Sequence, residues 1–240
     1  MVPRFEPGKV LEVIERDRAT IFGGVPTMFS ALLHHAERER FDVSSLRICI
    51  AGGASLPVEV LRGFDAAFGC KVLEGYGLSE TAAIATYNVP DRERKPGSIG
   101  IPVGGTEIKV VDDDDREVPP DEAGELVMRG PTVMKGYWNR AEATEQVMRG
   151  GWFHTGDIAR FDDGGYLFIV DRKKDLIIRG GYNVYPRELE EVIYEHPAVR
   201  KAAVVGIPHE SSDRAATRRR RAPRARSGTG RTARAACDRP

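Results

Sequence analysis

The chain has 240 residues, 41% of them hydrophobic, and equal numbers of basic and acidic residues. This length permits one large domain, or one domain with part of another, and no apolar run is long enough to span a membrane. Residues 1–9 lack the apolar core of a secretory signal. The three cysteines, Cys49, Cys70 and Cys237, have no metal-ligand spacing and are odd in number. This disfavours a disulfide framework and fits a cytoplasmic protein.

The net charge of the chain is zero, but the basic and acidic residues are unevenly distributed along it. Residues 214–240 hold ten Arg and one Asp, a net charge of +9, so residues 1–213 carry a net charge of −9. Because the segment 214–240 has almost no large hydrophobic side chain, we predict that it is disordered. Two interpretations remain open for it: a tail that binds nucleic acid or a membrane surface, or the product of a frameshift in a GC-rich gene.

The first eighty residues alternate helical and strand patterns, which predicts a mainly parallel sheet covered by helices. The apolar spacing of Val10, Val13 and Ile14 indicates one face of a first helix. Pro57 suits the start of a later helix whose apolar positions include Leu61 and Phe64. The other expected elements are strands at Ala19–Phe22, Leu46–Ile50 and Lys71–Leu73 and a helix over Thr27–Arg38.

After Pro96 short strand patterns follow one another, separated by turn-forming residues, which predicts a β-rich subdomain. The expected strands are Glu107–Val111, Glu125–Met128, Ile158–Phe161 and Tyr166–Val170. The chain then returns to a mixed pattern, with strands at Asp175–Ile178 and Lys201–Val205 on either side of a helix over Pro186–Glu195.

The segment Leu73-Glu74-Gly75-Tyr76-Gly77-Leu78-Ser79-Glu80-Thr81 collects several groups that suit a nucleoside phosphate. The aromatic ring between two glycines can stack on a base, and the hydroxyls can donate to phosphate oxygens. Glu80 supplies a hard oxygen ligand of the kind that Mg²⁺ prefers. The earlier segment Ala51-Gly52-Gly53-Ala54-Ser55-Leu56-Pro57 lets a ligand approach the backbone or simply permits tight packing.

Two later segments add polar groups that suit a sugar. Asp157, in Gly151-Trp152-Phe153-His154-Thr155-Gly156-Asp157, can accept hydrogen bonds from ribose hydroxyls, and Arg172 can donate to the sugar or to a phosphate. The alternative is a surface ion cluster at a strand end, which is common in proteins. The segment Gly180-Gly181-Tyr182-Asn183-Val184-Tyr185-Pro186 is either another close backbone approach or a turn before a helix.

These segments, in this order and spacing, resemble the adenylate-forming (AMP-binding) superfamily over residues 1 to about 213. The form RGGYNVYPRELEEVIYEHPAV is most similar to bacterial medium- and long-chain fatty-acid–CoA ligases. The resemblance implies an α/β fold class. Residues 1–171 would be the C-terminal part of the large domain, a parallel sheet with helices plus a β-rich subdomain. Residues 172–213 would begin a small α+β domain, followed by the tail at 214–240.

The resemblance also implies roles for matching positions. Nucleotide contacts would come from Gly53, Ala54, Ser55, Tyr76, Thr81, Asp157, Ile169 and Arg172, with Tyr76 stacking on adenine, Thr81 at the α-phosphate and Asp157 and Arg172 at the ribose. Glu80 would hold Mg²⁺ and Lys174 would be the hinge of the small domain. Gly77 would border the acyl pocket and Gly181 the CoA tunnel. The implied substrates and ligands are a carboxylic acid, ATP or AMP, Mg²⁺ and CoA.

The sequence departs from the family pattern at two places. No Ser/Thr/Gly-rich loop ending in Lys is present to hold the β- and γ-phosphates, and the only Lys after Lys174 is Lys201, which does not match the family's adenylating Lys. We therefore predict a fragment of an acyl-CoA synthetase that is inactive alone, with unpaired sheet edges and exposed apolar faces. The alternatives are a peptide-synthetase-type adenylation domain and a non-catalytic nucleotide- or partner-binding remnant. The sequence does not indicate an oligomeric state.

Overall fold

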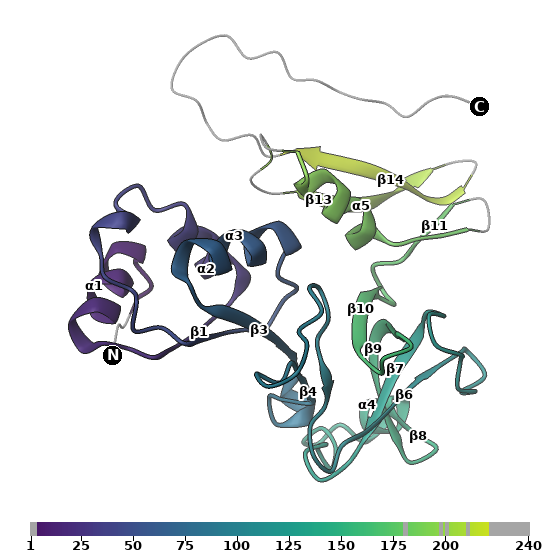
Figure 1. The fold of residues 1–240 in the computed structure, drawn as a ribbon. Coiled ribbons are helices and arrows are strands. Elements are labelled where there is room, and N and C mark those ends of the chain that lie inside the picture. The colour runs from purple at the N-terminus through teal and green to yellow at the C-terminus, as the bar shows by residue number, and fades with distance from the viewer. Residues whose placement is uncertain (1–3, 180–181, 197–198, 200–201, 210–211, 221–240) are drawn as a thin grey trace.

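The computed structural model describes residues 4–179, 182–196, 199, 202–209 and 212–220. Within them, none of the helices is both long and apolar enough to cross a membrane. The chain forms an α/β unit, a β-rich unit and a small C-terminal unit that lies against both (Figure 1). The predicted α/β fold class is confirmed, as is the change to short strands after Pro96.

The α/β unit is built on three parallel strands in the order β1-β2-β3, and an antiparallel pair, β4 and β5, extends the same sheet. Alternation of helices and strands produces the parallel part, because each helix carries the chain back across the sheet. The elements are α1 (Pro7–Asp17), β1 (Ile21–Gly24), α2 (Pro26–Leu33), η1 (Arg38–Arg40), β2 (Ile48–Ala51), α3 (Val58–Phe68), β3 (Lys71–Tyr76), η2 (Ser79–Thr81), β4 (Thr86–Tyr87) and β5 (Ile101–Pro102).

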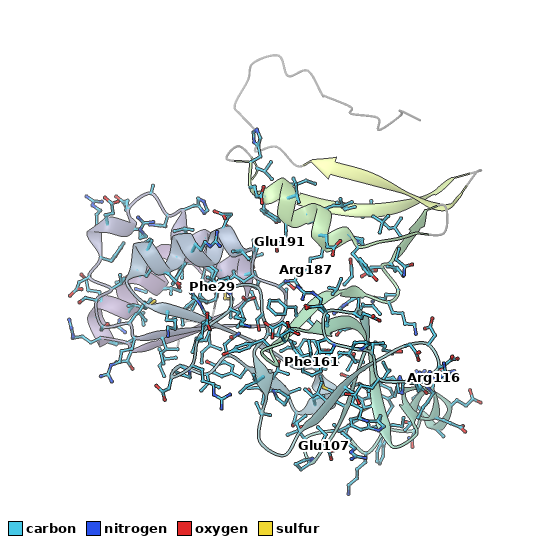
Figure 2. The ribbon with its side chains drawn as sticks, turned by 45° about the vertical axis from the view of Figure 1, so that its right-hand side comes forward. Phe29, Glu107, Arg116, Phe161, Arg187 and Glu191 are labelled. Carbon is cyan, nitrogen blue, oxygen red and sulfur yellow. The ribbon has the colours of Figure 1, made fainter. Side chains whose placement is uncertain are left out.

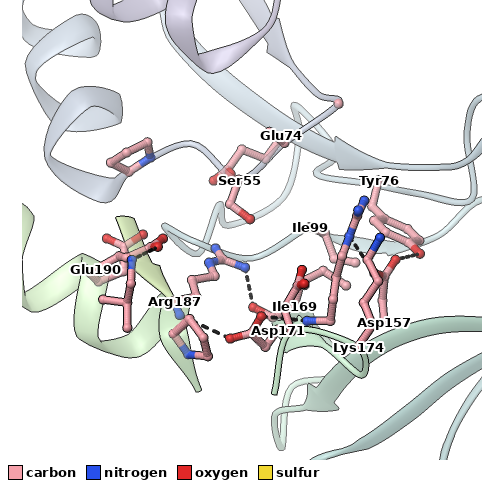
Figure 3. A pocket seen from close by; sticks show the side chains of 18 of the residues that line it. Ser55, Glu74, Tyr76, Ile99, Asp157, Ile169, Asp171, Lys174, Arg187 and Glu190 are labelled. Atoms are coloured by element: carbon pink, nitrogen blue, oxygen red, sulfur yellow. Dashed lines mark hydrogen bonds and ion pairs between the residues drawn. The ribbon is translucent and has the colours of Figure 1, made fainter. Parts of the chain in front are cut away.

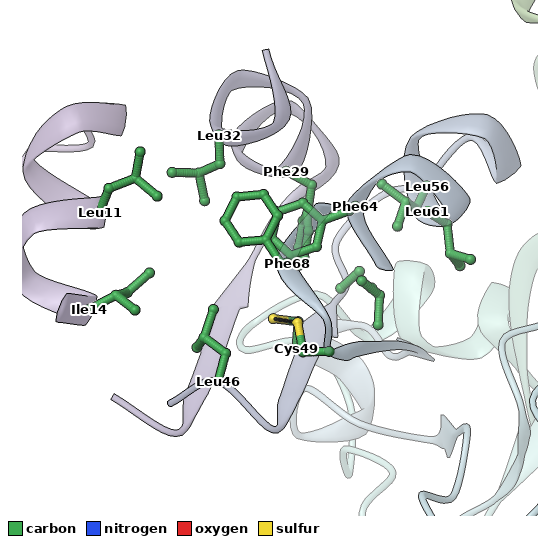
Figure 4. Packing of buried hydrophobic residues seen from close by; sticks show 13 residues of the cluster. Leu11, Ile14, Phe29, Leu32, Leu46, Cys49, Leu56, Leu61, Phe64 and Phe68 are labelled. Atoms are coloured by element: carbon green, nitrogen blue, oxygen red, sulfur yellow. Dashed lines mark hydrogen bonds between the residues drawn. The ribbon is translucent and has the colours of Figure 1, made fainter. Parts of the chain in front are cut away.

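The apolar faces of α1, α2 and α3 make one core with the parallel strands (Figure 4). Phe64 is fully buried, stacks on Phe68 at 3.9 Å between ring centroids and meets Phe29 edge-on at 4.9 Å. The Sγ atoms of Cys49 and Cys70 lie 3.3 Å apart in this core, and both thiols are free. This packing fixes β2 and β3, whose carboxyl ends reach the site described below.

One side of the parallel sheet is poorly covered. β1 is an edge strand, and Ile21 on it is 60% exposed, while Ile50 on β2 is 37% exposed. Parallel strands are usually buried on both faces. The expectation of an unpaired edge and exposed apolar side chains is therefore confirmed at β1 and β2.

The β-rich unit is an antiparallel sheet with strand order β10-β9-β7-β6, and β8 pairs with β9. Its inner face buries Leu126, Met128 and Leu167 in a second core. Short turns join β8 to β9 at residues 150–151 and β9 to β10 at residues 162–166, whereas β6 and β7 are separated by residues 112–123 and α4 lies between β7 and β8. The elements are β6 (Glu107–Val111), β7 (Gly124–Arg129), α4 (Ala141–Val147), β8 (Met148–Arg149), β9 (Trp152–Phe161) and β10 (Leu167–Arg172).

The C-terminal unit consists of α5 and two antiparallel strand pairs. Its elements are β11 (Ile177–Arg179), β12 (Tyr182–Val184), α5 (Pro186–Tyr194), β13 (Ala202–His209) and β14 (Ser212–Arg220). The structure pairs residues 212–220 with β13 as β14, and the disorder of the tail from Arg214 onward stays a prediction. Ladder hydrogen bonds join main-chain groups and tolerate a polar sequence, so composition alone did not show this strand. Residues 221–240 lie outside the described residues.

Candidate functional site

A cleft of about 820 Å³ opens where the carboxyl ends of β2 and β3 face β10 and α5 (Figure 3). Such strand ends are the usual ligand crevice of an open α/β sheet. The structure brings nine of the sequence-predicted site residues into the lining of this one cleft, although they span more than a hundred positions in the chain. They are Gly53, Ala54, Ser55, Tyr76, Gly77, Asp157, Ile169, Arg172 and Lys174.

The loop after β2 forms one wall of the cleft. Gly53 has a φ of +80°, a left-handed conformation that favours glycine, and Gly53 to Ser55 are exposed. Directly behind them, the Leu56 amide donates to Glu74 Oε1 at 3.3 Å. The loop is therefore fixed from behind by a buried carboxyl and leaves its small side chains open to the cleft.

The glycines on both sides of Tyr76 are explained by the packing of the chain against itself. A Cβ at Gly77 would lie 2.2 Å from the carbonyl oxygen of Ala83, and a Cβ at Gly75 would lie 2.8 Å from the Tyr87 ring. The close approach to both glycines is thus made by other parts of the same chain. These glycines allow β3 and the following turn to place Tyr76 at the cleft.

Three side chains from separate strands meet at the centre of the cleft. The Tyr76 hydroxyl donates to Asp157 Oδ2 at 2.5 Å, and Arg172 Nε lies 3.4 Å from Asp157 Oδ1. Asp157 and Arg172 are direct partners across the antiparallel pair of β9 and β10, which explains how two residues 15 positions apart meet. Tyr76 comes from the α/β unit, so this contact joins two units.

Burial governs the protonation of this group. Burial raises the pKa of Asp157, although the Tyr76 hydroxyl and the charges of Arg172 and Lys174 act in the opposite direction. Burial and the adjacent Asp157 carboxyl also raise the pKa of Tyr76. Tyr76 therefore keeps its proton and donates it to Oδ2. Oδ1 of Asp157 faces Arg172 and has capacity to accept a further hydrogen bond.

A second cavity, of about 500 Å³, shares Leu78, Asp157, Arg172 and Lys174 with the first. Glu80 lies in its lining, together with Tyr137 and the basic residue Lys173. Lys173 forms salt bridges with Asp113 at 2.9 Å and Glu125 at 3.2 Å. The second cavity thus combines the carboxyl groups of Glu80 and Asp157 with three cationic side chains, those of Arg172, Lys173 and Lys174.

One described residue of the predicted site, Thr81, lines neither cavity. Thr81 is fully buried in η2, where its Oγ1 accepts from the Leu78 amide at 2.9 Å and donates to the Leu78 carbonyl at 3.1 Å. Its hydroxyl is therefore used to shape the turn that carries Glu80, and its contact with a phosphate stays a prediction. Gly181 lies outside the described residues.

The cleft also contains charged residues that the sequence analysis did not single out. Arg187, the second residue of α5, donates from its guanidinium to the Ile169 carbonyl and from its amide to Asp171 at 3.2 Å. Figure 2 shows Arg187 and Glu191 on the side of α5 that faces the other units. Glu74, Asp171, Arg187 and Glu191 thus form a cluster of charged residues in the cleft lining. The carboxyl of Glu74, within the apolar run of β3, was the one signal in the sequence that could have indicated this cluster.

Burial shifts the ionisation of the cluster. Removal from water raises the pKa of Glu74 to about 7, although Arg187 and backbone donors partly oppose the shift. It also raises the pKa of Glu191 and lowers the pKa of Arg187. The contact between α5 and the α/β unit is therefore built from groups whose charged forms are disfavoured.

The comparisons with known proteins agree with this geometry. The sequence matches the profile of the AMP-binding enzyme family over residues 1–138. It is 46% identical over 209 residues to a long-chain-fatty-acid–CoA ligase of Bacillus subtilis, covering 87% of this chain and 37% of that protein. An Escherichia coli long-chain-fatty-acid–CoA ligase is 47% identical over 213 residues, covering 89% and 38%.

Among solved structures, the anthranilate CoA ligase AuaEII in complex with anthranoyl-AMP superposes with a TM-score of 0.82 at 35% identity. The match covers 88% of this chain and 41% of that one. The chain thus spans well under half the length of the relatives that it matches. The resemblance to bacterial fatty-acid–CoA ligases is confirmed, and the chain belongs to the AMP-binding enzyme family.

Proposed function

We propose that these residues hold the nucleotide half of an acyl-adenylate, as part of an ATP-dependent acyl-CoA synthetase. The observation that carries this proposal is the group formed by Tyr76, Asp157 and Arg172 at the cleft. It offers a fixed carboxylate acceptor beside a guanidinium donor, which suits the paired hydroxyls of a ribose. The relatives with CoA-ligase names, and the anthranoyl-AMP complex of AuaEII, support the same assignment.

The lining of the two cavities suggests how the ligand divides between them. We assign the base and the acyl group to the first cleft, where Tyr76 offers an aromatic ring and Gly53 to Ser55 offer a wall without bulky side chains. The phosphates would extend toward the second cavity, past Arg172 and Lys174. Asp157 lines both cavities, so a ribose bound to it would lie at their junction.

The chemistry of the second cavity fits a cation that is held mainly by the nucleotide. Within the described ranges, no three His, Cys, Asp or Glu side chains gather as a metal site. Mg²⁺ commonly binds through one or two carboxylates together with substrate phosphates, and Glu80 supplies one carboxylate here. When bound, the cation would neutralise charge that develops on the phosphates.

The parent reaction has two steps. A carboxylate attacks the α-phosphorus of ATP, which gives an acyl-adenylate and pyrophosphate, and the thiol of CoA then attacks the acyl carbonyl and displaces AMP. We propose that these 240 residues do not perform it alone, since they contain neither the phosphate loop nor a matching late Lys. Loss of one aligned electrostatic group commonly costs about 10²- to 10³-fold in rate, and two such groups are missing.

Binding of AMP to the purified chain tests the nucleotide assignment. Isothermal titration calorimetry should detect AMP and a non-hydrolysable acyl-adenylate analogue, and Asp157→Ala should weaken both by at least about tenfold, the value of a hydrogen bond to a charged group. Asp163→Ala is the matched control, because Asp163 is an exposed aspartate in the turn before β10. Thermal unfolding checks that each variant is folded. Equal affinities in the Asp157 variant and the unaltered chain would refute the ribose assignment.

Pyrophosphate exchange tests the proposed inactivity. With ATP and fatty acids of several lengths, we expect no exchange of labelled pyrophosphate into ATP above a protein-free blank. The Bacillus subtilis ligase serves as the positive control under the same conditions. Exchange that depends on both the chain and the fatty acid would contradict the claim that these residues are inactive alone.

A further inference from the structure

Glu80 is held by a loop far from it in the sequence. The Tyr137 hydroxyl donates to Glu80 Oε1 at 2.8 Å, and the Met134 amide donates to the Glu80 carbonyl oxygen at 2.7 Å. Tyr137 and Glu80 are 57 positions apart, so only the tertiary fold brings them together. One loop thus fixes both the backbone and the side chain of the carboxylate that lines the second cavity.

The loop is itself fixed by α4. Thr144 Oγ1 accepts from the Tyr137 amide at 2.9 Å and donates to the Arg140 carbonyl at 2.9 Å. Gly136 has a φ of +151°, and a Cβ there would lie 2.7 Å from Thr144 Cγ2. The backbone of Tyr137 is therefore anchored before any ligand binds, which limits the positions its hydroxyl can take.

The hydrogen bond to Tyr137 leaves part of the carboxylate free. Among the described residues, Tyr137 is the one side chain that hydrogen-bonds to the Glu80 carboxylate, and it occupies Oε1. A half-buried Glu side chain without this partner would sample several rotamers. With Oε1 held, Oε2 remains available as an oxygen ligand in a cavity that Arg172 and Lys174 also line.

We propose that Tyr137 is a positioning residue that orients Glu80 toward a nucleotide-bound divalent cation, and so sets how strongly that cation promotes nucleotide binding. This inference rests on the proposed function. It adds a residue that never touches the nucleotide itself and that acts only through Glu80. Removing the hydroxyl frees the carboxylate, and the loss should be confined to binding in the presence of the metal.

The measurement is the ratio of the ATP dissociation constant in EDTA to that in excess Mg²⁺, determined by calorimetry on the full chain. For the unaltered chain the ratio exceeds one. Glu80→Gln should reduce it to about one, and Tyr137→Phe should lower it part of the way toward one, by about fivefold, the value of one typical net hydrogen bond. Tyr166→Phe is the matched control, because the Tyr166 hydroxyl donates to the Glu93 carbonyl, away from both cavities.

The outcomes separate this inference from the proposed function. If Tyr137→Phe keeps the unaltered ratio, or weakens ATP equally in EDTA and in Mg²⁺, Tyr137 does not position Glu80 for a metal. The same conclusion follows if Tyr166→Phe lowers the ratio as much. If AMP binds but Mg²⁺ does not promote ATP binding even in the unaltered chain, only the metal assignment and this inference are overturned. If AMP does not bind at all, the proposed function falls as well.

Discussion

The buried carboxyl of Glu74 makes the stability of the fold depend on pH in a defined direction. Glu74 is 4% exposed at the end of β3, where it accepts from the Leu56 amide and faces α5. The perturbation is Glu74→Gln, which keeps the size and one acceptor oxygen of the side chain but cannot ionise. In the native protein, burial raises the pKa of Glu74 from an ordinary 4.5 to about 7.

Proton linkage determines whether the free energy of unfolding rises or falls with pH. Because the folded state holds this proton more tightly than the unfolded chain does, the free energy of unfolding falls as the pH rises between the two pKa values. The two pKa values are 4.5 and about 7. At about 1.4 kcal/mol for each pH unit between them, the free energy of unfolding falls by about 3 kcal/mol. The stability that the neutral carboxyl contributes is complete below pH 4.5 and is lost by pH values above about 7.

Urea unfolding at about pH 5 and about pH 8 measures this effect through the change in unfolding free energy. We expect the unaltered chain to lose up to about 3 kcal/mol more than Glu74→Gln between the two pH values. Glu122→Gln, at an exposed position, is the control for a carboxyl-to-amide change and should follow the unaltered chain. Parallel behaviour of Glu74→Gln and the unaltered chain would show that Glu74 is ionised in the native protein at both pH values.

Three further substitutions test the core and the site. Phe64→Ala removes a fully buried ring and should lower the unfolding free energy by about 3–5 kcal/mol in urea titrations; a loss under about 1 kcal/mol would contradict the packing described. Tyr76→Phe removes the donor to Asp157 and should weaken AMP binding about tenfold by calorimetry; unchanged affinity would mean that Asp157 needs no such partner. Gly77→Ala places a Cβ 2.2 Å from the Ala83 carbonyl oxygen and should therefore lower both the melting temperature and the affinity for AMP. A variant in which neither value changes would refute the close approach of Ala83 to Gly77.

Local patterns in the sequence predicted most of the elements. The spacing of Leu61 and Phe64 marked the buried face of α3, and Pro57 stands at the N-cap position of that helix. Strand patterns located β6 at its observed bounds and β7 and β10 within a residue or two. These predictions succeed because the apolar period of a helix or strand is set by residues close together in the chain.

The order of the motifs also indicated the family, since several segments had to match in sequence and spacing at once. That assignment placed Tyr76, Asp157 and Arg172 in one site before any geometry was known. The sequence could not show that the Tyr76 hydroxyl hydrogen-bonds to Asp157, because this contact spans 81 positions. Nor could it show that Thr81 uses its hydroxyl inside its own turn.

What the sequence determined by itself was therefore the kind of elements and the family, from which we proposed a set of groups that bind a nucleotide. The tertiary structure alone decided which groups are buried and which meet. Glu74 acquires its raised pKa because α5 and the loop after β2 remove it from water, and Glu80 acquires a partner because α4 anchors the loop of Tyr137. Desolvation and hydrogen bonding of this kind depend on neighbours supplied by distant parts of the chain, and residue type or spacing does not specify them.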